Sequence, residues 1–337
     1  MLMKLNLLAA RILCALLTAF TALSASAYDF EVDGIYYQIN SSTDKTVTVT
    51  SGPSSSQYTG KITIPSEVTH NEVTYKVTSI EYAFQNSSIE EVSIPDNVTE
   101  IICAFSGSHS LKSVELPKNL KTLIGAFMDC TSLISITIPE GIEKITGLCF
   151  TGCSSLQTII IPESVTFIET SSIDWCNSLP EIRIPDKVET IGEGALAYCT
   201  NLKQVEIGIG IKNIEGEVFN GCHNLELITI NAIEPPTAVE IPEGQTYGGT
   251  FDTRHYENTD LRVPYESIEK YRTAPVWENF FKDRNPLTAI EGVEAAEGAE
   301  SEVVARYDLS GRPVADDYRG MTIVRRADGS TAKEILR

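Results

Sequence analysis

The stretch "LISITIPEGIEKITGLCFTGCSS", residues 133–155, contains the pattern that decides the fold of this chain. Ile136 and Ile138 alternate with polar residues, as in a β-strand that buries one of its two faces. Pro139 follows directly, and because proline lacks the N–H that a strand interior needs, we expect the strand to end there. The stretch therefore predicts one short strand per unit, bounded by proline.

The same pattern recurs along the chain at intervals of 22 or 23 residues. Its units begin at Ile89, Leu111, Leu133, Leu156, Leu179, Leu202 and Leu225. A second apolar pair follows each strand pattern, such as Ile142 and Ile145. Repeats of this length are typical of solenoids, because one unit cannot bury its apolar face alone and stacked units can. We therefore expect a mainly β solenoid over residues 62–231, with back segments that are irregular or briefly extended.

A column of cysteines recurs at the same 23-residue interval. Its members are Cys130, Cys153, Cys176, Cys199 and Cys222. Equivalent positions of a solenoid lie on a line, whereas four zinc ligands must converge on one point, so no metal site is predicted. Neighbouring thiols could approach disulfide range, but stacked side chains point the same way and five members cannot all pair. We favour one buried file of packed thiols, and a sporadic disulfide is the alternative. Ser108, a small polar residue, takes this place in an earlier unit.

The consensus "LxxIxIPxxVxxIgxxAFxxCxxL" resembles the BspA-type leucine-rich repeats of exported bacterial proteins. Spacing, the Ile-Pro pair and the cysteine column carry this resemblance over residues 62–231. It implies a leucine-rich-repeat solenoid in a non-enzymatic protein that adheres to host extracellular proteins or to other cells. Residues 28–61 are similar to the hairpin-rich segment that precedes such arrays, with a turn at Asp33-Gly34, and we expect an N-terminal β cap.

The first 27 residues have the features of a secretory signal peptide. Lys4 gives a positive start, and the apolar run "ILCALLTAFTAL" is too short to span a bilayer comfortably. Small residues at Ala25-Ser26-Ala27 suit cleavage, so residues 1–27 are the predicted signal and the mature chain begins at Tyr28. The prediction is an exported protein, located at the cell surface or outside the cell, without a membrane span in the mature chain.

The period breaks after residue 231. Residues 232–288 contain a strand-like "LRVP" and a helical pattern from Ser267, anchored by Ile268, Tyr271 and Trp277. Such a segment is similar to a closing unit, and we expect it to cap the last repeat, although a separate binding site there is the alternative.

An acidic linker and a small β tail follow. Residues 289–302 carry five glutamates and no basic residue, which favours an extended, charged linker. Residues 303–337 contain three strand-like runs, with turns at Ser310-Gly311 and Asp328-Gly329. The tail resembles the C-terminal sorting domains of exported proteins in Bacteroidetes-like bacteria, which implies that secretion machinery is its partner. A β module without a targeting role is the alternative.

Charge and motifs disfavour several classes of function. The formal net charge of -20 repels phosphate backbones and acidic membrane surfaces, so we predict no nucleic-acid partner. The sequence has four histidines and contains no GxSxG, HExxH or glycine-rich phosphate loop. We predict no catalytic, cofactor-binding or metal-binding residue and no cofactor, and an enzyme remains only as a residual hypothesis.

The outward positions of the predicted strands are the candidate ligand face. Ile160 and Leu227 are apolar where the pattern predicts polar residues, and together with Arg183 they are the leading contact candidates. The full set of candidates is Glu115, Thr137, Ile160, Arg183, Glu206, Thr158, Glu181 and Leu227. Solenoids commonly use such a repeated surface for recognition, and a merely solvated face is the alternative. The predicted function is adhesion to a protein or glycan of the host matrix or of other cells. The alternative is a structural spacer or envelope component without a dedicated ligand.

Overall fold

The computed structural model describes residues 28–53, 58–245 and 248–282 in full, and the backbone of 303–307, 320–326 and 331–336. The chain forms two compact units, Met1–Phe280 and Phe281–Arg337, and each is described by itself. The predicted signal peptide, the acidic linker and the two turns of the tail lie outside the described residues. In the part that is described, no helix is long and apolar enough to cross a membrane.

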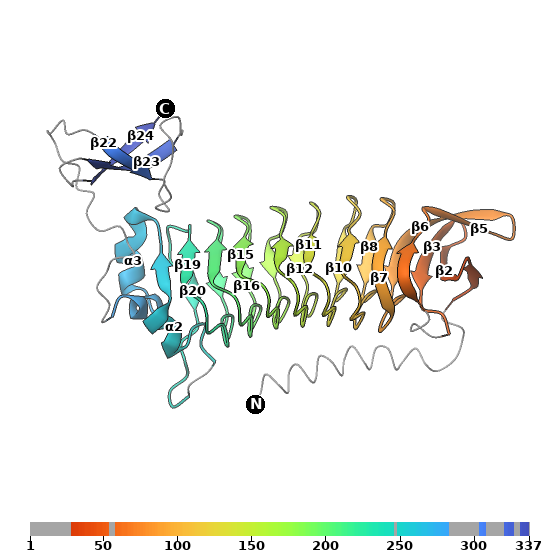
Figure 1. The fold of residues 1–337 in the computed structure, drawn as a ribbon, viewed down its shortest axis with the longest axis horizontal. Coiled ribbons are helices and arrows are strands. Elements are labelled where there is room, and N and C mark those ends of the chain that lie inside the picture. The colour runs from red at the N-terminus through yellow and green to blue at the C-terminus, as the bar shows by residue number, and fades with distance from the viewer. Residues whose placement is uncertain are drawn as a thin grey trace. The chain divides into compact units, whose positions relative to one another are not determined.

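The first unit contains a stack of short parallel strands, one from each turn of the chain, which we call the front sheet (Figure 1). Its strands are β4 (Thr59–Thr63), β7 (Ser88–Ser93), β9 (Ser113–Glu115), β11 (Ser135–Thr137), β13 (Thr158–Ile160), β15 (Glu181–Ile184), β17 (Gln204–Ile207), β19 (Leu227–Ile230) and β21 (Asp260–Arg262). Equivalent residues of adjacent turns pair in register, as Ile136 does with Ile159. Most of these strands end at or just before an apolar residue and a proline, where the missing proline N–H ends the ladder, whereas Gly208 and Asn231 follow β17 and β19.

A second stack of parallel strands, the back sheet, lies on the other side of the core. Its strands are β6 (Val73–Glu81), β8 (Glu100–Ile102), β10 (Thr122–Ile124), β12 (Lys144–Ile145), β14 (Phe167–Ile168), β16 (Thr190–Ile191), β18 (Asn213–Ile214) and β20 (Thr237–Ala238). The back segments are thus regular enough to pair, since Ile145, Ile168 and Ile191 occupy equivalent positions of successive turns. The prediction of a mainly β solenoid is confirmed.

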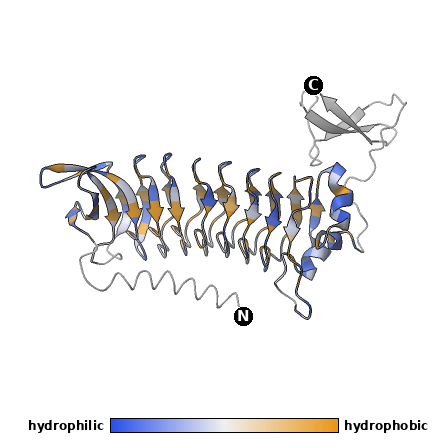
Figure 2. Cartoon of the chain, turned by 180° about the vertical axis from the view of Figure 1, so that it is seen from behind, coloured by the Kyte–Doolittle hydropathy of each residue, from blue (hydrophilic) through white to orange (hydrophobic). Residues whose placement is uncertain are grey.

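The core between the two sheets consists of columns of identical or similar side chains. Figure 2 shows apolar residues recurring at the same places in successive turns. Phe84, Phe105, Phe127 and Phe150 stack with ring centroids 5.6, 5.4 and 5.5 Å apart, and all four are buried. Stacked aromatic pairs of this kind add about 0.5–1.5 kcal/mol each beyond the burial of their area.

The cysteine column forms one buried file, as the sequence predicts. The side chains of Cys130, Cys153, Cys176, Cys199 and Cys222 are fully buried. Each thiol donates a hydrogen bond to a backbone carbonyl of the preceding turn, at 3.1 to 3.3 Å. Ser108 does the same with its hydroxyl, toward the carbonyl of Phe84. All seven cysteines in the described residues are free, so the file holds thiols and not disulfides.

The residues before the repeats extend the back sheet with an antiparallel hairpin. Strands β1 (Phe30–Val32) and β2 (Ile35–Ser41) are joined by the predicted turn, at which Asp33 and Gly34 have φ values of 52° and 79°. Strand β3 (Thr46–Thr50) pairs antiparallel with β2 and parallel with β6, and β5 (Glu67–His70) also pairs with β6.

The segment after the repeats is more helical than its sequence pattern predicts. It contains α2 (Thr253–Asn258), η2 (Tyr265–Ser267), α3 (Ile268–Thr273) and η3 (Trp277–Phe280). Helix α2 was not predicted, because six residues are too few for a periodic pattern. The predicted anchors are buried: Trp277 Nε1 donates to the carbonyl of Pro236 at 2.8 Å, and Tyr271 Oη donates to that of Ala232 at 3.1 Å.

The second unit contains a three-stranded antiparallel sheet. Its strands are β22 (Val303–Tyr307), β23 (Gly320–Arg326) and β24 (Thr331–Leu336), with β23 in the centre.

Candidate functional site

All eight candidate residues lie on the outward face of the front sheet. Side chains alternate between the core and the surface along each strand, so in β15 Ile182 and Ile184 are buried while Glu181 and Arg183 are exposed. Leu227 is half-buried, and the other candidates are exposed. The alternation follows from strand geometry, because successive side chains point to opposite faces.

The structure arranges the candidates in two neighbouring files that run across the turns. The first file contains Glu115, Thr137, Ile160, Arg183 and Glu206, and the second contains Thr158, Glu181 and Leu227. Strand pairing places Thr137 beside Ile160 and, two turns on, Arg183 beside Glu206. Glu181 and Leu227 are separated by Gln204, so they share a file without lying on adjacent strands.

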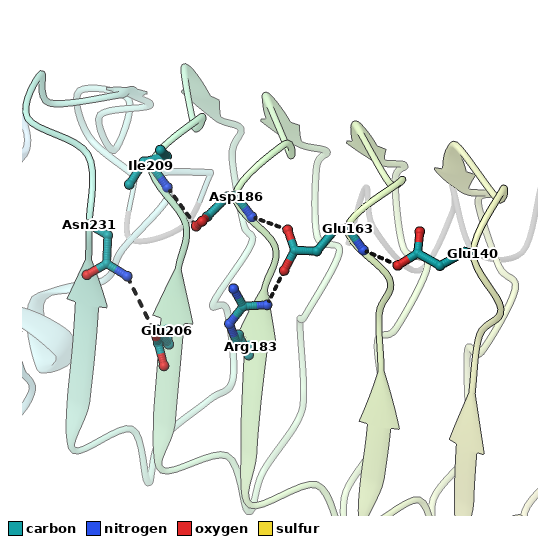
Figure 3. Close-up of polar contacts among 7 residues, drawn as sticks. All are labelled: Glu140, Glu163, Arg183, Asp186, Glu206, Ile209 and Asn231. Carbon is teal, nitrogen blue, oxygen red and sulfur yellow. Dashed lines mark hydrogen bonds and ion pairs between the residues drawn. The ribbon is translucent and has the colours of Figure 1, made fainter. Parts of the chain in front are cut away.

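Arg183 is held by an ion pair on this face (Figure 3). Its Nη1 lies 2.7 Å from Oε1 of Glu163, and both side chains are about half exposed. The hydrogen bond from Arg183 lowers the pKa of Glu163 and raises the pKa of Arg183 in return. An exposed pair of this kind contributes roughly 0–1 kcal/mol to stability, so its main effect is to orient the guanidinium.

A file of carboxylates at the corner after the front strands was missed by the sequence analysis. Oxygens of Glu140, Glu163 and Asp186 accept backbone N–H groups of the following turn, from Glu163, Asp186 and Ile209, at 3.2, 3.2 and 3.3 Å (Figure 3). These residues directly follow the Ile-Pro pair, and that recurrence was the available signal. Each carboxylate therefore satisfies a donor that the strand ladder leaves open.

Strands β11 and β13 present the one pair of adjacent strands in β7–β19 whose outward residues carry no charge. We call these residues the neutral patch; they are Ile134, Ser135, Thr137, Gln157, Thr158 and Ile160. Ile134 and Ile160 are 47% and 53% exposed. The sequence analysis did not predict Ile134 and Gln157 as part of this surface, because they precede β11 and β13. Only the stacking of turns places them on the outward face of the front sheet.

A shallow depression opens at the start of the front strands. It has a volume of about 660 Å³, and its lining is mostly amide and hydroxyl side chains. The lining residues are Gln157, Asn177, Ser178, Pro180, Thr200, Asn201 and Asn224. Amide groups both donate and accept hydrogen bonds, so this surface suits neutral polar groups such as peptide amides or sugar hydroxyls.

The four histidines of the described residues do not share one site, although His223 and His255 both interact with Asp252. His70 stacks on Phe30 with ring centroids 4.2 Å apart, and His109 Nδ1 lies 2.9 Å from the carbonyl of Asp129. His255 is buried and belongs to the capping box that begins α2. Across these same residues, no group of three or more His, Cys, Asp or Glu side chains is arranged to hold a metal ion.

A front strand closed by Ile-Pro, a paired back strand and an interior of leucine, phenylalanine and cysteine define a leucine-rich-repeat solenoid. The family described as BspA type leucine rich repeat region matches residues 77–125 and 124–235, in six copies. The repeats of this chain are thus similar to that family over residues 77–235.

Several solved leucine-rich-repeat structures are similar to this chain. A leucine-rich-repeat protein of T. pallidum has 24% identity and a TM-score of 0.40, over 60% of this chain and 84% of that protein. A leucine-rich cell surface protein of Faecalibacterium prausnitzii has 22% identity and a TM-score of 0.35, over 71% and 95%. A leucine-rich-repeat protein of Bacteroides capillosus has 31% identity and a TM-score of 0.34, over 40% and 97%. No curated protein matches the chain significantly.

Proposed function

We propose that this chain is an exported, non-enzymatic, surface-associated binding protein that uses its front sheet for adhesion. Its partners would be proteins or glycans of the host matrix or of other cells. The observation that carries the proposal is the neutral patch, which exposes Ile134 and Ile160 in a chain of net charge -20.

The composition of the front sheet supports this role. Interface cores are depleted of charge and surrounded by a polar rim, because burying an unpaired charge is costly. The neutral patch has that composition, and the strands on either side carry charged outward residues such as Glu115 and Arg183. Backbone pairing between turns fixes the spacing of these side chains, so little ordering entropy would be lost when a partner binds.

The predicted signal peptide and the second unit support export. The tail belongs to a compact unit of its own, Phe281–Arg337, which is consistent with an address recognised by secretion machinery. Deleting residues 303–337 should therefore leave the protein in the cell or release it from the surface, as fractionation would show. Unchanged surface display would contradict the role of the tail.

Binding assays with the purified mature chain test adhesion directly. Immobilised matrix proteins and glycans should show saturable binding, and Ile160→Asp should weaken it at least tenfold by placing a charge in the neutral patch. Lys144→Glu, an exposed change on the back sheet, is the matched control and should have no effect. If no matrix protein or glycan binds saturably, the adhesion proposal is wrong.

A further inference from the structure

We propose that, when no other partner covers it, the front sheet pairs face to face with the front sheet of a second copy of this chain. The two-fold axis of this dimer would run parallel to the strands, between β11 and β13. This inference rests on the proposed function in one respect, namely that the front sheet is the recognition face. It goes further by naming one partner and the residues that meet.

The register between turns determines which strands would face each other across such an axis. Backbone hydrogen bonds keep equivalent residues of adjacent turns in register. Ile134 N donates to the carbonyl of Lys112, and Gln157 N donates to that of Ile134. An axis between β11 and β13 therefore places β11 opposite β13 of the second copy. In the same way it places β9 opposite β15 and β7 opposite β17.

The centre of this arrangement contains only neutral side chains. Thr137 would lie opposite Ile160 of the second copy, and Ser135 opposite Thr158. The neutral patch is thus its own counterpart across the axis, and the exposed isoleucines would be covered without desolvating a charge.

The strands next to the centre carry opposite charges at matching positions. Glu115 on β9 and Arg183 on β15 occupy the same column, so each would meet the other across the axis. Lys118 and Asp186, which directly follow the last proline of their turns, match in the same way. Arg183 already contacts Glu163, but a guanidinium has five N–H donors and can serve a second carboxylate.

The next strands outward repeat this match. Glu90 and Lys203 precede β7 and β17 at equivalent positions and would face each other. Each already has an exposed partner in its own chain: Glu90 pairs with Lys112 at 2.6 Å, and Lys203 with Glu226 at 3.5 Å. The dimer would join these two pairs into a network of four alternating charges.

One like-charged pair falls near the axis, where Glu140 would lie opposite Glu163. Glu163 is neutralised locally, since Arg183 lies 2.7 Å from it. The other two-fold arrangement, with antiparallel strands, would place each turn opposite itself. If its axis followed the column of Glu91 and Glu181, each of these would face an identical glutamate, which disfavours that register.

The area available is sufficient for a stable dimer. Seven strand spacings from β4 to β19 give a length of about 34 Å, and six residue steps give a width of about 20 Å. The resulting face of roughly 680 Å² per copy, or roughly 1,400 Å² in total, lies within the range of specific protein interfaces.

Mixing two charge-reversed variants tests the register directly. Sedimentation equilibrium of the mature chain should show a dimer that weakens as salt is added. Glu115→Arg and Arg183→Glu should each weaken self-association at least tenfold, because each puts like charges opposite each other. An equimolar mixture of the two variants should dimerise again, since the arginine introduced in one variant then meets the glutamate introduced in the other.

The mixture separates a specific contact from a loss of structure, because two misfolded variants would not restore each other. Lys144→Glu should dimerise like the natural chain. A natural chain that is monomeric at 100 μM, or variants that do not recover on mixing, would overturn the inference. If the natural chain is a monomer that binds matrix proteins, the dimer is wrong and the adhesion proposal stands. If it is a dimer that binds no matrix protein, self-association stands and the adhesion proposal is wrong.

Discussion

At the residue scale, the thiol file shows why a small polar side chain recurs at one position of each turn. Each side chain must fit between two stacked neighbours and also donate to the carbonyl behind it. Phe150 O accepts both Cys153 N and the Cys176 thiol, so the thiol supplies the second bond to an already paired group. Cysteine and serine meet both requirements, which explains Ser108 in the earlier turn.

Replacing Cys176 tests this explanation. Cys176→Ser should keep the hydrogen bond and lose packing volume, at a cost of about 1 kcal/mol in the free energy of unfolding. Cys176→Ala should cost more, because it removes the donor as well. Urea denaturation measures both variants, and saturable binding to a partner should be unchanged in each. A larger cost for serine than for alanine would contradict the hydrogen-bonding role.

The reactivity of the thiols gives a second test at this scale. The described residues contain seven cysteines, of which only Cys103 is partly exposed. Burial raises the pKa of Cys149 to about 12 and raises the pKa of Cys153, Cys176 and Cys222 well above its usual range. Because the thiolate is the reactive form, a thiol reagent should modify at most Cys103 in the native protein and the other six only after unfolding. Rapid native labelling of several thiols would disprove the buried file.

At the scale of single elements, the cap of α2 gives the chain a definite acid sensitivity. Burial opposes ionisation of Asp252, but its hydrogen bonds and electrostatic interaction with His255 outweigh burial and lower the pKa of Asp252 to about 2. The lowered pKa means that the ionised cap stabilises the fold above about pH 4, and that this contribution disappears as the pH falls toward 2.

Asp252→Asn should reveal that contribution. Asparagine still caps the helix but carries no charge. Because the pKa of Asp252 is lowered to about 2, the variant should be less stable than the natural chain by about 2 kcal/mol above about pH 4. The difference from the natural chain should shrink as the pH approaches 2. Urea midpoints measured on both proteins across this range check the prediction. A difference that is constant with pH would show that charge is not the cause.

Elements with a strong period were predictable, and elements defined by three-dimensional contact were not. The strand at Ile136 and Ile138 follows from alternation and the adjacent proline. Helix α2 depends on the cap between Asp252 and His255, which no periodic signal announces. The two candidate files could be predicted from the repeat length alone. The neutral patch could not, because Ile134 precedes its strand and is placed on the outward face only by the stacking of the turns.

At the scale of the whole repeat array, the structure predicts that turns can be removed as units. Deleting residues 156–178 takes out one complete turn, so the flanking columns should rejoin and the chain should still unfold cooperatively. Deleting residues 156–166 removes about half a turn and would place front residues in the back sheet, so it should abolish folding. Circular dichroism during urea titration distinguishes the two.

The one-turn deletion has a further effect on the dimer. Removing β13 would leave Glu115 opposite Glu206 of a second copy, so self-association should be lost although the fold is kept. Sedimentation of the folded deletion variant measures this. A deletion variant that still dimerises with the affinity of the natural chain would contradict the proposed register.

The thiol file also gives the array a direction. Every donor in it reaches toward the preceding turn, from Cys130 to the carbonyl of Phe105 and from Cys222 to that of Leu196. If the chain emerges from a membrane pore with its N-terminus first, the carbonyl that accepts each thiol's hydrogen bond leaves the pore before the thiol does. Assembly could then follow translocation turn by turn, and each completed turn would resist the chain sliding back.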